Sequence, residues 1–218
     1  MQDFEVPSEV ITIVIFALAF LLVVLCLLWL IGVFRTLVFE PTKLAPMTFA
    51  YKTFRGPYAE GGPHFAALLK FMKRHGFDTS ITPSAGIYYD DPKTTTVTRY
   101  AVGFLIKQDD TASKKKWVKF QQDSKEEAKE WSVLELKDTP TIVSVFPMHL
   151  IVIQSAVSAM KTYPAFEATA YEIKSGSMEI YRTDNKTVET HFPQGNYDQF
   201  CPQESDSFAP ASDEKKVQ

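Results

Sequence analysis

One acidic residue and several tyrosines form the pattern with the clearest chemical potential in this sequence. Two segments share an Ile-Tyr pair, one beginning at Gly86 and the other at Glu179, so that their alignment matches Tyr88 with Tyr181. A carboxylate among aromatic rings attracts an organic cation by charge and by cation–π contact. Alternation along a strand leaves open the other possibility, that Glu179 faces solvent at a sheet edge. We expect a ligand-binding groove formed by Glu179, Tyr181, Tyr88, Tyr89 and Tyr58, of which the last two could equally be core residues.

Signals for other kinds of chemistry are weak. The sequence has no G-x-S-x-G elbow, no glycine-rich phosphate loop and no Cys-His nucleophile pair, and no two of its four histidines are spaced as i,i+4. The net charge is -3 with scattered basic residues, which does not suggest a nucleic-acid partner. We expect no catalytic residues, no metal and no cofactor, and keep a small-molecule hydrolase as the least favoured alternative.

The N-terminal region contains a run typical of a membrane anchor. Residues 10–34 include no charged side chain and would span about 37 Å as a helix, against a hydrocarbon core of about 30 Å. A cleaved signal peptide is the alternative, but no basic segment precedes the run and no small-x-small cleavage site follows it. The bilayer is therefore an expected partner of residues 10–34.

The charges that flank this run predict its orientation. The only charged side chains in residues 1–9 are acidic, whereas Arg35 and Lys43 follow the run closely. By the positive-inside rule, residues 1–9 are lumenal and the C-terminal part is cytosolic. The sequon at Asn185 argues the other way, because a lumenal domain could carry a glycan there.

After the anchor, the apolar and turn-forming residues predict an alternation of strands and helices. A linker, residues 35–46, leads to one domain, residues 47–193, and a polar tail, residues 194–218, is predicted to be disordered. The expected strands are 47–54, 85–89, 97–106, 132–136, 141–146, 178–182 and 187–192. The expected helices are 61–75, 113–131 and 149–161, the last broken or restarted at Pro164.

The order of these elements indicates an internal duplication. Strand, helix, strand, strand occurs once from residue 47 and again from residue 141, and residues 132–136 and 141–146 look like a hairpin. Such a repeat usually builds one antiparallel sheet with both helices on one face and a groove at the pseudo-dyad. The expected fold class is α+β.

The residues around both Ile-Tyr pairs resemble a known family. Residues 86–92 and 100–104, together with residues 179–181, resemble strands of the GyrI-like domain. That resemblance implies a groove for apolar, often cationic, small molecules, with its single carboxylate at Glu179. An N-terminal anchor before such a domain resembles the testis-expressed protein 264 family of endoplasmic-reticulum proteins, over roughly residues 10–200.

The second resemblance implies a reticulophagy receptor in the endoplasmic-reticulum membrane, with an aromatic-x-x-aliphatic motif that binds Atg8-family proteins. Phe208 with Ala211 is one candidate, although Ala211 fills an aliphatic pocket poorly. Trp131 with Leu134 is another, at a helix-to-strand junction where such residues are more often core. We expect an interaction module of this kind. The alternative is a binder or sensor of a small hydrophobic cation.

Overall fold

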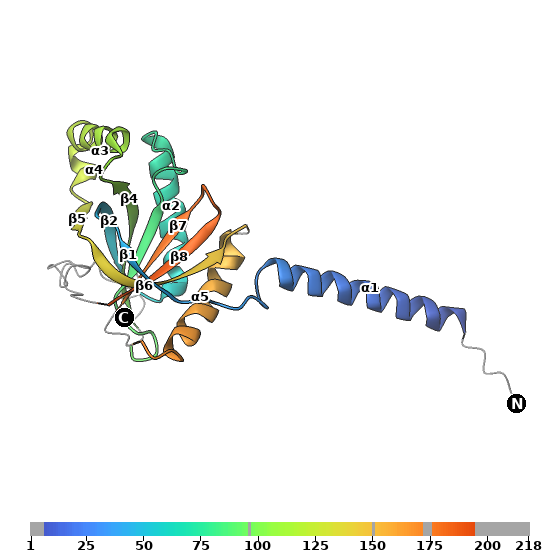
Figure 1. Cartoon of the computed structure of the whole chain (residues 1–218). Helices are drawn as coiled ribbons and strands as arrows, with labels where there is room; N and C mark the ends of the chain where they lie inside the picture. The colour runs from blue at the N-terminus through green and yellow to red at the C-terminus, as the bar shows by residue number, and fades with distance from the viewer. Residues whose placement is uncertain (1–6, 96, 150, 172–175, 195–218) are drawn as a thin grey trace, which may run out of the picture.

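The computed structural model describes residues 7–95, 97–149, 151–171 and 176–194 of the chain (Figure 1). The helices are α1 (Ser8–Leu30), α2 (Gly61–Arg74), α3 (Thr111–Asp123), α4 (Lys125–Ala128) and α5 (Ile151–Glu167), with a short 3-10 helix at Tyr58–Glu60. The strands are β1 (Glu40–Leu44), β2 (Met47–Arg55), β3 (Ser84–Tyr88), β4 (Arg99–Lys107), β5 (Ser132–Leu136), β6 (Thr139–Pro147), β7 (Ser177–Arg182) and β8 (Thr187–Pro193).

All eight strands form one antiparallel sheet in the order β1-β6-β8-β7-β3-β4-β2-β5. The duplication is visible in this order. Outward from the central β3–β7 pair, the strands β3, β4 and β2 on one side correspond to β7, β8 and β6 on the other. Gly86 lies directly opposite Glu179 in that pair, so the pseudo-dyad passes between these two residues. The α+β fold class is confirmed.

The two faces of the sheet bury different clusters. One face, with Phe104 at its centre, packs against Phe71 of α2 and Trp117 of α3. The other face has no helix in its cluster. The sheet curls there, so that Leu44 of β1 and Leu136 of β5 join Ile180 of β7 in one core. Successive residues of a strand point to opposite sides of the sheet, so one strand contributes buried apolar side chains to both clusters.

Three local expectations are corrected by the structure. Residues 132–136 and 141–146 do not form a hairpin: β5 pairs with β2, whereas β6 pairs with β1 and β8. Pro164 does not break the helix expected at residues 149–161. It lies in the last turn of α5, which continues to Glu167. The expected linker, residues 35–46, contains β1.

α1 extends away from the domain (Figure 1). It is long and apolar enough to cross a membrane, and none of its residues is buried inside the protein. A membrane anchor and a signal sequence both have these properties. The predicted tail, with Phe208 and Ala211, lies beyond residue 194 and therefore outside the described residues.

Candidate functional site

The candidate site lies at the pseudo-dyad, where a glycine faces the carboxylate. A Cβ atom on Gly86 would come within 3.1 Å of the ring of Phe65 and 3.2 Å of the Tyr88 hydroxyl oxygen. The missing side chain therefore leaves room for these two rings beside Glu179. This close approach explains why the first half of the duplication has no second acid at this position.

Tyrosine hydroxyls surround the carboxylate of Glu179, which is only 6% exposed. Tyr163 of α5 donates a hydrogen bond to Oε1 over 3.1 Å, and Tyr181 donates one to Oε2. The hydroxyl of Tyr88 lies 3.5 Å from that of Tyr181. Ser177 adds a further contact, with its Oγ atom 2.7 Å from the hydroxyl of Tyr163. The acid is thus held in a cage of neutral donors.

Burial dominates the electrostatics of this cage. It raises the pKa of Glu179 above its ordinary value, although the hydrogen bonds from Tyr181, Tyr163 and Tyr88 oppose the rise. Burial, followed by the charge of Glu179, raises the pKa values of the three tyrosines well above their usual range, so they remain hydrogen-bond donors at neutral pH. None of the described residues that influence the pKa of Glu179 is a cation.

The sheet next to Glu179 continues as a row of buried hydroxyl groups. Thr190 of β8 lies directly opposite Glu179, and Ser144 of β6 lies directly opposite Thr190. Residues paired across strands point to the same face, so both hydroxyl groups share the face of Glu179. Thr190 is 1% exposed and Ser144 is 2% exposed, and Ser144 Oγ has no hydrogen-bond partner among the described residues.

A matching polar stripe lies on the inner side of α5. Gln154, Ser158 and Thr162 recur every four residues and are all buried. Residues with this spacing share one face of a helix, and α5 packs against β6 and β8. Within the described part of the chain, the hydroxyl oxygens of Ser158 and Thr162 have no hydrogen-bond partner. We call these three residues the inner stripe.

Neighbouring apolar contacts place the inner stripe over the hydroxyl row. On one side of the row, Val157 packs with Phe146 and Val188. On the other side, Tyr163 and Phe166 pack with a cluster that contains Ile142 and Phe192. Ser158 and Thr162 lie between these contacts along α5, and Ser144 and Thr190 lie between them along the strands. Buried hydroxyl groups therefore gather from both layers beside Glu179.

The structure brings only some of the predicted groove residues together. Glu179, Tyr88 and Tyr181 meet as described above. Tyr58 adjoins them, since its ring lies 4.9 Å from that of Tyr88, but its hydroxyl is occupied by the backbone of Asp90. Tyr89 belongs to the cluster on the opposite face of the sheet and takes no part in the cage.

The sequence prediction missed Phe65, Tyr163, Ser177 and the inner stripe. The four-residue spacing of polar residues within an otherwise apolar helix was the signal that could have indicated the stripe. Trp131 and Leu134, the alternative candidates for Atg8 binding, pack inside the domain. Trp131 packs 4.4 Å from the ring of Phe71, and Leu134 packs on the core of the other face.

A cleft of about 420 Å³ lies apart from Glu179, between α2 and Trp131. Two cations at this cleft, Lys52 and Arg74, already pair with carboxylates, those of Glu130 and Glu127. Glu179, by contrast, has no ion-pair partner among the residues that the structure describes. For this reason we regard the cage as the better candidate site.

A family model covers nearly the whole domain. The family model described as a GyrI-like small molecule binding domain matches residues 39–194. A search of curated protein sequences gives no significant match.

Several solved structures are similar to this chain at low sequence identity. An integron cassette protein of Vibrio cholerae is 12% identical, with 73% of this chain and 100% of that chain covered and a TM-score of 0.47. A putative transcription regulation protein of Staphylococcus aureus is 11% identical, with coverages of 72% and 97% and a TM-score of 0.42. SAV2435, described bound to tetraphenylphosphonium, is 11% identical, with coverages of 74% and 96% and a TM-score of 0.42. Likenesses of this size carry no argument about the ligand of this chain.

Proposed function

The chain belongs to the GyrI-like small molecule binding domain family, and from this premise we propose that it binds a small apolar cation at Glu179, in a domain that α1 anchors to a membrane. The observation that carries the proposal is the buried carboxylate without a basic partner. Ionisation of such a group is costly in the closed domain, and a bound cation would offset that cost. Part of the free energy of cation binding would thus come from offsetting the cost of an ionised, buried Glu179.

The walls of the cage suit the apolar part of such a ligand. Phe65 packs edge-to-face against Tyr181 at 4.9 Å, and Tyr88 adjoins the same hydroxyl network. Aromatic rings of this kind stabilise an organic cation through their negative faces. The unpartnered hydroxyl groups of Ser144, Ser158 and Thr162 are available to polar groups of the ligand, or to water that enters with it.

The test compares two ions of the same shape and opposite charge. Full-length chain in lipid nanodiscs is titrated with tetraphenylphosphonium and with tetraphenylborate, as wild type and as the Glu179→Gln variant, and empty nanodiscs of the same lipid correct for partition into lipid. We expect the wild type to bind the cation in preference to the anion, and Glu179→Gln to weaken cation binding about ten-fold or more. Equal cation binding by both chains would refute the role of Glu179.

A reticulophagy receptor of the endoplasmic reticulum is the second candidate. Its support is the sequence resemblance to the testis-expressed protein 264 family and the presence of α1. In that function an Atg8-type contact would fall to Phe208, because Trp131 and Leu134 are packed within the domain. A pull-down of an Atg8-type protein by the full-length chain, lost on Phe208→Ala, would support this function, and no binding by either chain would exclude a tail contact.

A further inference from the structure

The outer side of α5 has an unusual composition for a surface helix. Between residues 153 and 164 the exposed positions are Ile153, Ala156, Met160 and Pro164, all apolar, with Met160 77% and Ile153 53% exposed. We call these four residues the outer face. Between residues 153 and 164, α5 thus exposes apolar side chains and buries the polar inner stripe, whereas a surface helix of a soluble domain normally exposes its polar side. Val157 and Phe166 of the same helix still pack on the core.

The same helix holds the end of α1. The side-chain amide of Gln154 donates a hydrogen bond to the backbone oxygen of Leu30 over 3.1 Å. Lys161, seven residues further and on the same side of α5, donates to the backbone oxygens of Val33 at 2.5 Å and Arg35 at 2.6 Å. Gln154 thus satisfies a carbonyl group that the end of α1 leaves without a partner, and Lys161 binds the turn that follows, where its ammonium complements the negative end of the helix dipole.

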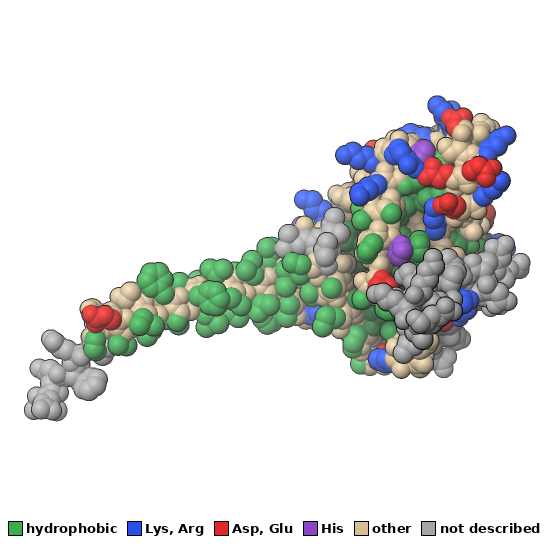
Figure 2. Space-filling view, turned by 180° about the vertical axis from the view of Figure 1, so that it is seen from behind, with side chains coloured by type: hydrophobic (Ala, Val, Ile, Leu, Met, Phe, Trp, Pro, Cys, Tyr) green, Lys and Arg blue, Asp and Glu red, His purple; other side chains and the backbone are tan. Residues whose placement is uncertain are grey.

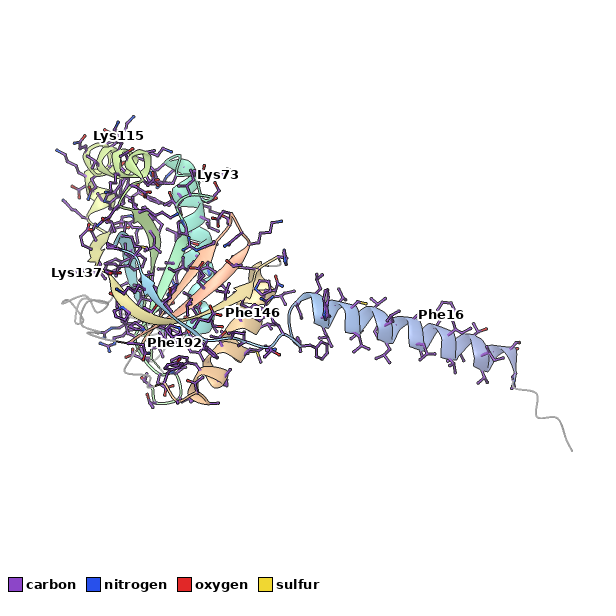
Figure 3. All side chains as sticks on the ribbon, in the orientation of Figure 1. Phe16, Lys73, Lys115, Lys137, Phe146 and Phe192 are labelled. Carbon is purple, nitrogen blue, oxygen red and sulfur yellow. The ribbon has the colours of Figure 1, made fainter. Side chains whose placement is uncertain are left out.

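The chain also turns tightly at this junction. Gly32 has a φ of +87°, and a Cβ atom there would lie 2.6 Å from the ring of Phe146. Phe146, at 1% exposed, belongs to the rigid core of the domain. Figure 3 shows Phe146 on the side of the domain nearest α1, whereas Lys73 and Lys115 lie toward the far end. The direction in which α1 leaves the domain is therefore fixed by contacts on both sides of the turn.

From these contacts we propose that the outer face of α5 lies on the lipid bilayer. The inference rests on the proposal that α1 is a membrane anchor. At about 35 Å, α1 just spans the hydrocarbon core, so its end at Leu30 emerges at the interface. Because α5 hydrogen-bonds that end directly, α5 lies at the interface as well. Figure 2 shows apolar side chains along the length of α1. The apolar outer face of α5 would extend this surface.

The neighbouring side chains suit the same surface. Phe34 is 59% exposed and Val38 is 62% exposed, and both follow the end of α1. Arg35 lies between them in the sequence, is exposed, and can meet lipid phosphate groups. Interfacial helices combine apolar residues on one side with flanking basic residues in this way.

The experiment measures depth with a fluorophore on single cysteines. Met160→Cys, Ile153→Cys and, as the matched control, Val118→Cys of α3, which is 49% exposed, are made in full-length chain that carries Cys26→Ser and Cys201→Ser. Each variant is labelled with nitrobenzoxadiazole in vesicles of phosphatidylcholine and phosphatidylserine. We expect a quencher attached to the lipid chains to quench positions 160 and 153 about three-fold or more over position 118.

The outcomes separate this inference from the proposal beneath it. Release of the chain from the vesicles by alkaline carbonate would show that α1 is not a membrane anchor. The inference would then fail as well. Retention of the chain with equal quenching at all three positions would leave the anchor in place and overturn the inference. Shielding of position 160 from an aqueous quencher without contact to the lipid quencher would assign the outer face to a second copy of the chain, and would also overturn it.

Discussion

Glu179 and its tyrosines make the folded state sensitive to proton concentration at the scale of single residues. The pKa of Glu179 is raised in the folded protein above its ordinary value of 4.5, mainly by burial. Between 4.5 and the raised pKa, Glu179 therefore binds more protons in the folded chain than in the unfolded chain. The contribution of Glu179 to stability falls in this window as the pH rises.

The matching prediction concerns Glu179→Gln. We expect the free energy of unfolding of the wild type to decrease as the pH rises above 4.5, and the variant to lack most of this decrease, because glutamine has no charge to bury. Denaturant titration of both chains in the same nanodiscs, from pH 4.5 to pH 8, measures the difference. Parallel pH profiles would show that Glu179 is solvated and not caged.

At the scale of elements, α5 combines two surfaces that each weaken its fit to a soluble domain. The inner stripe leaves hydroxyl groups without partners, which destabilises the closed state. We expect Thr162→Val, an exchange of similar shape, to raise the free energy of unfolding by about 1 kcal/mol and to weaken binding of tetraphenylphosphonium. Thermal unfolding and the nanodisc titration measure the two effects.

The control for this exchange is Ser113→Ala in α3. Ser113 is also buried, but its hydroxyl pairs with that of Thr82 at 2.8 Å. Its loss should lower stability and leave ligand binding unchanged. A loss of stability from Thr162→Val would mean that its hydroxyl has a partner, and would contradict the assignment of the inner stripe to the site.

The helices and strands also show how much of this site could be predicted from the sequence. The duplicated Ile-Tyr segments indicated that Glu179, Tyr88 and Tyr181 would meet, because an internal repeat fixes the pairing of its central strands. Tyr163 could not be found in this way, since its position depends on the rotation of α5 over the sheet. The pairing of β5 with β2 depends in turn on the curl of the whole sheet, which no local turn signal contains.

At the scale of the whole molecule, the anchor and the exposed turn between β7 and β8 report on the orientation of the domain. Asn185 is exposed in this turn, and the hydroxyl of Thr187 donates to its side-chain oxygen over 2.6 Å. We expect no glycan on Asn185 in cells that perform N-glycosylation, because the basic residues after α1 favour a cytosolic domain. A mobility shift after N-glycosidase treatment, absent in Asn185→Gln, would place the domain on the lumenal side.

The pairing of β1 with β6 has a consequence for biosynthesis. β1 (Glu40–Leu44) leaves the ribosome soon after α1, yet its partner β6 (Thr139–Pro147) follows only after roughly 100 further residues, or about 5 to 20 s of translation. If α1 is a membrane anchor, as proposed above, a chain inserted through it displays during that interval an open strand and an uncapped carbonyl group at the end of the helix. A message truncated before α5 would therefore yield an inserted stub that can never complete either contact, a natural substrate for membrane-protein quality control.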